Sequence, residues 1–252
     1  MGNLTPNIHY LIVFIGGLGA GFIGVLVGGC SFFTIPLLIF VGLPPHIAIA
    51  TNRLGLLGMI FTGGYKYHRQ HLIDYKIGFL IGVMALIGSI CGAHLMLSLD
   101  TAVLKIVIAI LSCILLLIII FQPERGLVEC KKKTTKKDYV VGSVLSFALG
   151  VYGGFYGAGV GTMLSYMLVL LFGKTFLQSA GTRKIPMLLL SIMATMIFIL
   201  KGVINYPYAL LLFVGMAIGA FVGAHHAKAI GNVWLKKMFL GLALIMVVLL
   251  LR

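Results

Sequence analysis

Long apolar stretches recur along almost the whole chain and are separated by short polar turns. They fall at about 8–29, 31–43, 45–64, 75–97, 101–121, 139–158, 162–173, 175–200, 207–226 and 232–251. A transmembrane helix needs about 20 mostly apolar residues, and most of these stretches approach that length. Transmembrane barrel strands are only ~10 residues long and alternate in polarity. The pattern therefore predicts an all-α polytopic membrane protein.

The charge composition fits the same class. Charged residues make up only 10% of the chain and hydrophobic residues 61%, whereas a soluble domain is about a quarter charged and half apolar. This excludes an ordinary soluble enzyme, and we expect no enzymatic activity. The 19 basic against 5 acidic residues would suggest nucleic acid in a soluble protein. In a membrane protein, basic residues gather in cytoplasmic loops, so we expect lipid rather than nucleic acid around the chain.

The chain divides into two similar halves. We expect a first transmembrane repeat over 1–121, a basic cytoplasmic linker over 122–138 and a second transmembrane repeat over 139–252. Arg53 and Arg183 lie 130 positions apart, and the segment Gly88–His94 matches Gly219–His225 at an offset of 131. Each repeat holds about five helical segments.

The basic residues predict the orientation of the chain. Residues 65–76 and the linker are rich in Lys and Arg and should be cytoplasmic, whereas the turn at Asp100 should be outside. Lys174 and the basic residues of 228–237 fit the cytoplasm as well, although they correspond to first-half turns placed outside. The second half is therefore expected to be inverted, an arrangement that recurs in secondary transporters. We expect an integral protein of the bacterial inner membrane with both termini outside.

Two of the apolar stretches are too short to cross comfortably at about 1.5 Å per residue. The stretches 31–43 and 162–173 should form broken hairpins with the segments before them, interrupted at the glycine-rich runs Gly28–Ser31 and Gly157–Thr162. The first hairpin should open outward and the second toward the cytoplasm. Whether the hairpins cross fully or re-enter halfway is open at this stage.

Acidic residues are absent from the apolar segments. All five lie in loops or at predicted helix ends: Asp74, Asp100, Glu124, Glu129 and Asp138. Membrane cation sites and proton relays commonly use buried carboxylates. Their absence argues against a cation transporter and against a membrane hydrolase that uses paired carboxylates or a carboxylate-bound metal. We expect neither a metal nor another cofactor.

Basic residues do lie inside the apolar segments. Arg53 and Arg183 are each about nine residues into a segment, roughly 12–14 Å from its end, close to the middle of a ~30 Å core. Lys184 follows Arg183 directly. Because no internal acid is available, a small anion from outside is the natural partner, and a guanidinium suits multi-oxygen anions. The alternative is that each arginine binds the end carbonyls of a broken helix. Both interpretations are open.

The glycine-rich breaks favour an anion site too. An interrupted helix presents free N–H groups and the positive end of its dipole. Besides the three basic residues, the candidate substrate-binding residues are Thr51, Asn52, Thr182, Gly29, Cys30, Ser31, Gly159, Gly161, Thr162 and Tyr152. Close packing through small residues is the simpler explanation for glycine pairs such as Gly88 and Gly92. The cysteines have no CxxC spacing, and we expect them to be buried.

The ordered motifs resemble those of the sulfite exporter TauE/SafE family of bacterial membrane proteins. They are Ile35-Pro36-Leu37-Leu38, Ala48-Ile49-Ala50-Thr51-Asn52-Arg53-Leu54, the glycine-rich run Gly150–Gly161, and Lys184. The resemblance spans nearly the whole chain. It implies transport of sulfur-containing anions such as sulfite, sulfoacetate or related sulfonates. Two departures from the family pattern are Cys30 with Ser31 in place of glycines, and no acid near Gly153.

The sequence thus predicts a secondary transporter that moves small sulfur-containing anions by alternating access. Two alternatives are kept. One is an anion channel with the same charge logic. The other is a membrane redox or assembly partner, in which Cys30 and Cys91 would matter.

Overall fold

The computed structural model of the chain is helical throughout the residues that it describes, which are 6–100, 103 and 135–250. Its helices are α1 (Pro6–Leu26), α2 (Ser31–Phe40), α3 (Pro45–Arg69), α4 (Tyr75–Ser98), α6 (Lys136–Phe155), α7 (Val160–Phe172), α8 (Phe176–Thr182), α9 (Lys184–Leu200) and α10 (Tyr206–Leu250). The all-α prediction is confirmed for these residues. The predicted segment 101–121 and most of the linker lie outside them.

Six stretches of the described chain are long and apolar enough to cross a membrane: Ile8–Leu26, Pro45–Arg69, Tyr75–Ser98, Lys136–Phe155, Phe176–Leu200 and Tyr206–Gly231. Helices are favoured because a bilayer offers no water to satisfy backbone N–H and C=O groups. The shorter α2 and α7 have 10 and 13 residues, which is roughly 15–20 Å. Each predicted hairpin therefore joins one helix of spanning length to one that is too short to span.

Two predicted boundaries need correction, and a third agrees with the structure. Helix α6 begins at Lys136, inside the predicted linker, because Thr135 and Asp138 form a capping box in which each side chain accepts the other's backbone N–H. The predicted helix 175–200 is two helices, α8 and α9, that meet at Arg183. Helix α10 is interrupted at Gly231, where φ is 70° and ψ is 170°, within the gap predicted between 226 and 232.

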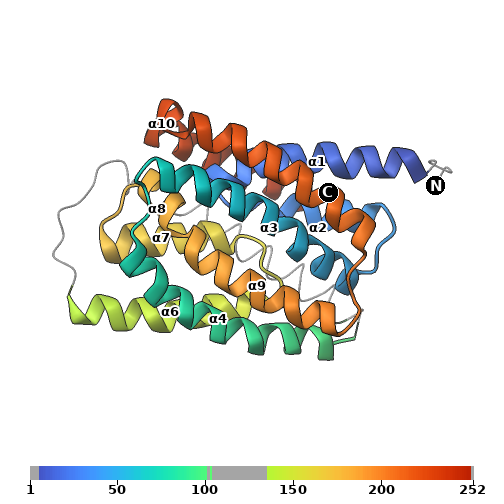
Figure 1. Cartoon of the computed structure of the whole chain (residues 1–252), viewed down its shortest axis with the longest axis horizontal. Coiled ribbons are helices and arrows are strands. Elements are labelled where there is room, and N and C mark those ends of the chain that lie inside the picture. The colour runs from blue at the N-terminus through green and yellow to red at the C-terminus, as the bar shows by residue number, and fades with distance from the viewer. Residues whose placement is uncertain (1–5, 101–102, 104–134, 251–252) are drawn as a thin grey trace.

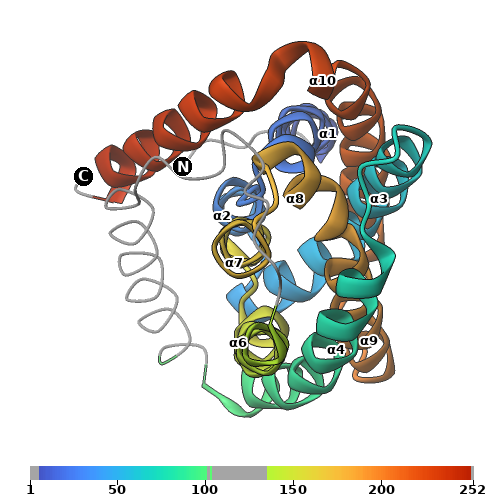
Figure 2. The same ribbon diagram turned by 90° about the vertical axis from the view of Figure 1, so that its left-hand side faces the viewer.

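The helices form two rows (Figures 1 and 2). Seen end-on in Figure 2, α1, α2, α7 and α6 follow one another along one side, and α10, α3, α9 and α4 along the other, with the short α8 between them. In Figure 1 the pair α1 and α10 lies at the top and the pair α4 and α6 at the bottom. The short helices of the two hairpins are thus surrounded by long ones.

Glycines bring the long helices into backbone contact. A Cβ atom on Gly88 or Gly92 of α4 would collide with carbonyl oxygens of α6, at Phe147 and Val151. On the opposite edge, a Cβ on Gly219 of α10 would collide with the Leu18 carbonyl of α1. The packing interpretation of Gly88 and Gly92 is confirmed. In both contacts residue numbers rise together, so α4 runs parallel to α6 and α10 runs parallel to α1.

The helix contacts have a reciprocal pattern. Helix α1 packs on α10 and α6 packs on α4; α3 packs on α10 and α9 packs on α4; α3 and α9 touch each other. If α1 is exchanged with α6, α3 with α9 and α4 with α10, the set of contacts stays the same.

Polar loops join the two halves at both ends of the molecule. At one end, which we call the basic end, the Lys174 ammonium lies 2.8 Å from the Asp74 carboxylate, and the Gln70 side chain donates to the Ala224 carbonyl. The turns around residues 70–74 and 174, both predicted to be cytoplasmic, therefore share one end. The opposite end holds the turns 41–44 and 201–205, where Asn205 bonds Thr51.

The cysteines are placed in two ways. Cys30 is buried, as predicted, and Cys91 is exposed on α4. The expectation of burial is wrong for Cys91 because its face of α4 is turned away from the other helices.

Candidate functional site

The two glycine-rich breaks face each other in the interior. Gly28 (φ 90°) lies so close to the second break that a Cβ there would come within 2.7 Å of the Thr162 nitrogen. The Thr162 hydroxyl donates to the Val27 carbonyl at 3.4 Å. At the second break, Gly159 (φ 77°) precedes α7. Positive φ angles cost glycine little, so these residues let one broken helix approach the other.

Arg183 ties the first break to the second. One terminal nitrogen donates to the Val27 carbonyl at 2.9 Å, the Gly161 carbonyl at 3.2 Å and the Ser165 hydroxyl at 2.5 Å. The other donates to the carbonyls of Gly24 and Val25 at 3.2 and 3.1 Å. The side chain is fully buried. The guanidinium therefore satisfies carbonyls at the C-terminal end of α1, where a helix has no partners of its own for them.

Arg53 makes the reciprocal contact. It lies in α3 and donates to the Gly153 carbonyl in the last turn of α6. Gly157 packs directly against this guanidinium, with no room for a Cβ. The Tyr152 hydroxyl fixes the same break by donating to the Ala158 carbonyl at 2.7 Å.

The sequence left open whether each arginine binds an anion or the end carbonyls of a broken helix. In the structure both arginines bind end carbonyls. Each lies in one half and binds helix-end carbonyls of the other, where the helix dipole favours a positive charge. The nearby residues keep their expected positions at the breaks. Their role toward a substrate stays a prediction.

Lys184 differs from the arginines. Only 2% of it is exposed, and its ammonium has no hydrogen-bond partner among the described residues. The ammonium lies over the Tyr67 ring, 5.9 Å from its centre, and 3.6 Å from where a Cβ of Gly63 would stand. The Tyr67 hydroxyl itself is bound to the Val25 carbonyl. Among the three buried basic side chains of the site, Lys184 is thus the one whose terminal nitrogen has no hydrogen-bond partner in the described chain.

Small polar groups surround the start of α2. The Asn52 amide donates to the Ser31 hydroxyl at 3.0 Å, and the Thr34 hydroxyl donates to the Asn52 oxygen at 2.5 Å. The Cys30 thiol lies 3.9 Å from the Met59 sulfur. Thr34 is a contact that the sequence did not single out, because a lone threonine in an apolar run gives no signal.

The N-termini of α2 and α7 meet at these breaks without side-chain caps. Neither Cys30 nor Gly159, the residues that precede the two helices, provides a side-chain hydrogen bond to the first turn. Gly29 has a φ of 72°, and Gly161 follows at the start of α7. An uncapped first turn offers N–H groups to an anion. In α2 the N–H groups of Phe32 and Phe33 already donate to the Gly29 and Cys30 carbonyls, so the start of α7 is the better of the two.

Thr51 and Thr182 have a role that the sequence did not predict. The Thr182 hydroxyl accepts the backbone N–H of Asp74, and the Thr51 hydroxyl accepts that of Asn205, both at 3.0 Å. Each bond joins one half to the other. The offset of 131 between 51 and 182, and again between 74 and 205, is the sequence signal that would have identified them.

Asp74 sits at the basic end of this arrangement. Partial burial raises the pKa of its carboxyl, but hydrogen bonds from Lys174 and the Ile77 N–H, together with the Lys174 charge, outweigh burial and hold that pKa below its ordinary value of 3.8. Asp74 is therefore ionised at neutral pH.

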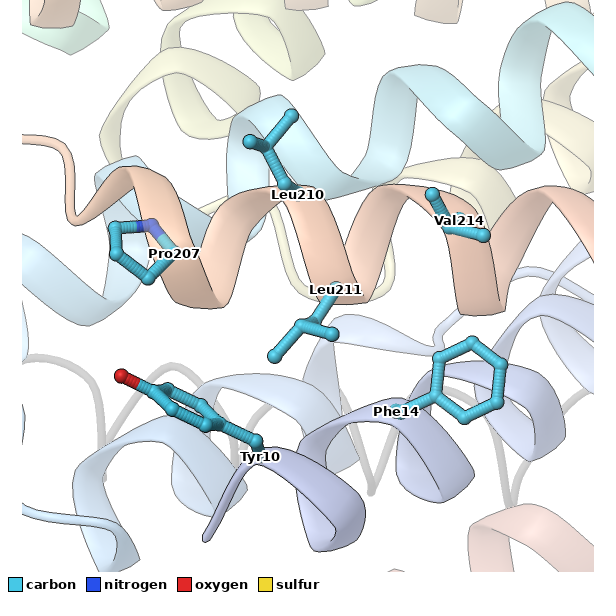
Figure 3. A pocket seen from close by; sticks show the side chains of 6 residues that line it. All are labelled: Tyr10, Phe14, Pro207, Leu210, Leu211 and Val214. Atoms are coloured by element: carbon cyan, nitrogen blue, oxygen red, sulfur yellow. The ribbon is translucent and has the colours of Figure 1, made fainter. Parts of the chain in front are cut away.

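A further cavity among the described residues is apolar. An apolar cavity of about 460 Å³ lies between α1 and α10 and is shown in Figure 3. It is lined by Tyr10, Phe14, Pro207, Leu210, Leu211 and Val214, none of which belongs to the breaks. The described part of the chain also contains no group of three His, Cys, Asp or Glu side chains suited to a metal ion.

Comparisons with known proteins agree with these features. The family model of "Sulfite exporter TauE/SafE" matches residues 13–250. The chain is 30% identical to "Probable membrane transporter protein YdhB" of Bacillus subtilis, over 90% of this chain and 92% of that protein. It is 28% identical to a "Probable membrane transporter protein" of Haemophilus influenzae, over 90% and 88%. It is 25% identical to "Probable membrane transporter protein YfcA" of Escherichia coli K12, over 96% and 89%.

No solved structure matches the chain. The match nevertheless covers both broken hairpins, both buried arginines and Lys184. The chain is an integral membrane protein that belongs to the sulfite exporter TauE/SafE family of membrane transporters.

Proposed function

We propose that this protein is a secondary transporter that moves small sulfur-containing anions, such as sulfite, sulfoacetate or related sulfonates, across the inner membrane by alternating access. Lys184 is the observation that carries the proposal. A buried ammonium with no acceptor is costly, and the described interior contains no carboxylate to neutralise it. An anion bound beside Lys184 removes that cost.

The substrate lies between the two breaks in this proposal. Lys184 supplies the charge, and the uncapped first turn of α7 supplies N–H groups. Ser31, Asn52 and Thr162 add small polar groups at the same breaks. Arg53 and Arg183 hold the broken helices in place, so the anion is bound by the other groups of the site and not by the arginines alone. A sulfonate or sulfite group, with several oxygens around one centre, matches donors that converge from several directions.

The proposal includes two inverted repeats. It is supported by the reciprocal helix contacts and by the parallel pairs α1 with α10 and α4 with α6. Successive helices joined by short turns run in opposite directions, so α1 and α3 run one way and α4 runs the other way. Because α6 is parallel to α4, α1 and its counterpart α6 point in opposite directions. Inverted repeats let one half take the conformation of the other, which is how alternating access arises in several transporter folds.

The proposed orientation follows from the basic end. Lys66, Arg69, Lys76 and Lys174 gather there, and cytoplasmic loops carry an excess of basic residues. The basic end therefore faces the cytoplasm, and the start of α1 faces outside.

The central groups are closed to solvent in the structure. Thr51, Asn52, Arg53, Thr182, Arg183 and Lys184 are each at most 2% exposed. A substrate reaches them only after one end opens, as alternating access requires.

Uptake by the purified full-length chain in proteoliposomes tests the proposal, with radiolabelled sulfite and sulfoacetate as probes. Lys184→Met should reduce uptake roughly tenfold or more, because a hydrogen bond to a charged group contributes about 1.5–3 kcal/mol. Leu54→Met is the matched control, since Leu54 follows Arg53 as Lys184 follows Arg183, and it should transport normally. Unchanged uptake by Lys184→Met would overturn the assignment. Currents far above carrier turnover without counterflow would indicate a channel instead.

A further inference from the structure

The two threonine hydrogen bonds between the halves have matching geometry at the two ends of the molecule. Asp74 precedes α4 and caps it by accepting the Ile77 N–H at 3.1 Å. Asn205 precedes α10 and accepts the Tyr208 N–H at 3.4 Å. The N–H of each capping residue then bonds a fully buried threonine of the other half at 3.0 Å.

Each threonine is next to the central site along the chain. Thr182 is the last residue of α8 and directly precedes Arg183. Thr51 lies two residues before Arg53 on α3. A separation at either threonine therefore displaces the helix segment that carries an arginine, and it does so at one end only.

The two ends differ in charge. At the basic end the Asp74 carboxylate also binds Lys174 at 2.8 Å, which adds a second tie between the halves. The residues 130 and 131 positions before Lys174 are Pro44 and Leu43, so the opposite end has no equivalent cation, and Asn205 is uncharged. Leu72 also packs its carbonyl against Gly181 of α8, where a Cβ would come within 2.6 Å.

We propose that the Asp74–Thr182 and Asn205–Thr51 contacts are the two gates of the central site, and that the Lys174 ion pair makes the basic-end gate the harder to open. This inference rests on the proposed function, because a gate needs a site to enclose. In the resting protein the opposite end opens more often, so the central site is reached mainly from the side of the α1 N-terminus.

Chemical access to Cys30 tests the two gates without any transported anion. Cys30 lies at the first break and is 3% exposed. In a chain with Cys91→Ala, Cys113→Ala and Cys130→Ala it is the one thiol left. A membrane-impermeant maleimide is added to either side of proteoliposomes. Lys76→Cys marks the basic end and Lys201→Cys the opposite end, each in a chain with all four native cysteines replaced.

We expect faster modification of Cys30 from the opposite end. Thr182→Val, which keeps the side-chain shape but removes the acceptor, should raise the rate from the basic end alone. Lys174→Met should raise the same rate roughly two- to fivefold, the range of a partly exposed ion pair. Thr51→Val should raise the rate from the opposite end alone. Thr195→Val is the matched control, since its buried hydroxyl has no partner in the described structure, and it should change neither rate.

Equal increases from both sides in any gate variant would indicate general loosening and would overturn the proposal, as would unchanged rates. Hydrogen exchange gives a second measurement for variants that fold less well. Thr182→Val should speed exchange in the peptide covering 70–76, and Thr51→Val in that covering 201–207, with no crossover. One-sided Cys30 access without anion uptake would leave the gates intact and reject the proposed function. Anion uptake without one-sided access to Cys30 would support the proposed function and overturn the two gates.

Discussion

The two buried arginines occupy corresponding positions in the sequence. Both bind carbonyls at helix ends, but Arg183 has more acceptors than Arg53. Arg183 has five acceptors on α1 and α7, whereas Arg53 donates to one carbonyl of α6. The next residue is Lys184 in the second half and Leu54 in the first. Each half thus has an arginine that binds a helix end. Only the second half has a neighbouring buried basic group, Lys184, whose ammonium has no hydrogen-bond partner among the described residues. In the proposed function, the repeat accounts for the scaffold, and the difference between the halves accounts for the anion site.

Replacing the arginines one at a time should give the largest effects. Arg183→Gln removes the guanidinium from a buried cluster of five acceptors and should lower the free energy of unfolding by about 3 kcal/mol or more, because each hydrogen bond from a charged donor contributes about 1.5–3 kcal/mol. Arg53→Gln should cost about 1.5–3 kcal/mol, because it removes one charged hydrogen bond. Thermal unfolding in detergent measures both. Equal losses would show that the extra acceptors of Arg183 contribute nothing.

The unpartnered charge that attracts an anion should come from the second half alone. Sulfite at about 100 times its dissociation constant should stabilise the protein by about 2.7 kcal/mol. Lys184→Met should abolish this stabilisation without lowering the melting temperature in the absence of anion, since it removes an unsatisfied buried charge. Leu54→Met should keep the full anion effect. A melting temperature that falls sharply in Lys184→Met without anion would mean that Lys184 is structural.

The glycine contacts at the two edges of the molecule offer a smaller contrast. Gly92→Ala drives a methyl group into the backbone of α6 and should cost about 1–3 kcal/mol. Gly223→Ala should cost less, because its Cβ would stand 2.8 Å from the Phe22 carbonyl oxygen, which is a looser backbone contact than that of Gly92 with the Val151 carbonyl. Gly19→Ala meets nothing within 4 Å and should stabilise α1 by up to about 1 kcal/mol. Chemical or thermal unfolding checks the order.

Corresponding turns at the two ends differ in the residue that takes the left-handed conformation. Gly202 has a φ of 65° and its counterpart His71 a φ of 57°. Gly202→Ala should cost about 1 kcal/mol, because a Cβ is unfavourable there. His71→Ala should change stability little, since the strain is already present. Similar losses in both variants would contradict this account.

The basic-end ion pair should have the smallest effect. Asp74→Asn keeps a helix cap but loses the charge, and should cost about 0.2–1 kcal/mol at pH 7. A depressed pKa in the folded state stabilises the fold above the unfolded pKa, and the gain is lost as pH falls through the folded pKa. The wild type and Asp74→Asn should therefore differ by a constant amount from pH 5 to 8 and converge below about pH 4. Melting temperatures across this range test the sign.

Much of the fold was predictable because it depends on chain-local properties. Apolar stretches of about 20 residues must be helical in a bilayer, and most helix ends fell within a few residues of the predicted positions. The start of α6 was missed because a capping box of two polar residues moved it into the basic linker. The interruption at Arg183 lies three residues before Pro186, a residue that favours a kink at this point of the sequence.

The site was predictable in its residue types and less so in its contacts. The sequence singled out Arg53, Arg183 and Lys184 as charges inside apolar segments, and the structure buries all three. It did not distinguish them, because a guanidinium that binds an anion and one that binds a helix end look alike in sequence. It also treated Thr51 and Thr182 as donors to a substrate, since the N–H groups they accept lie on loops of the other half.

Sequence alone thus predicted that the chain folds in a membrane, where most of the described long helices begin and end, and that the apolar segments hold no acid. These follow from composition and from runs of neighbouring residues. The tertiary structure decided which of the buried basic side chains has a terminal nitrogen without a hydrogen-bond partner. Arg183 and the carbonyls at the end of α1 are more than 150 positions apart. Only the packing of one half against the other shows that the terminal nitrogens of both arginines find carbonyl acceptors, whereas the Lys184 ammonium finds none among the described residues.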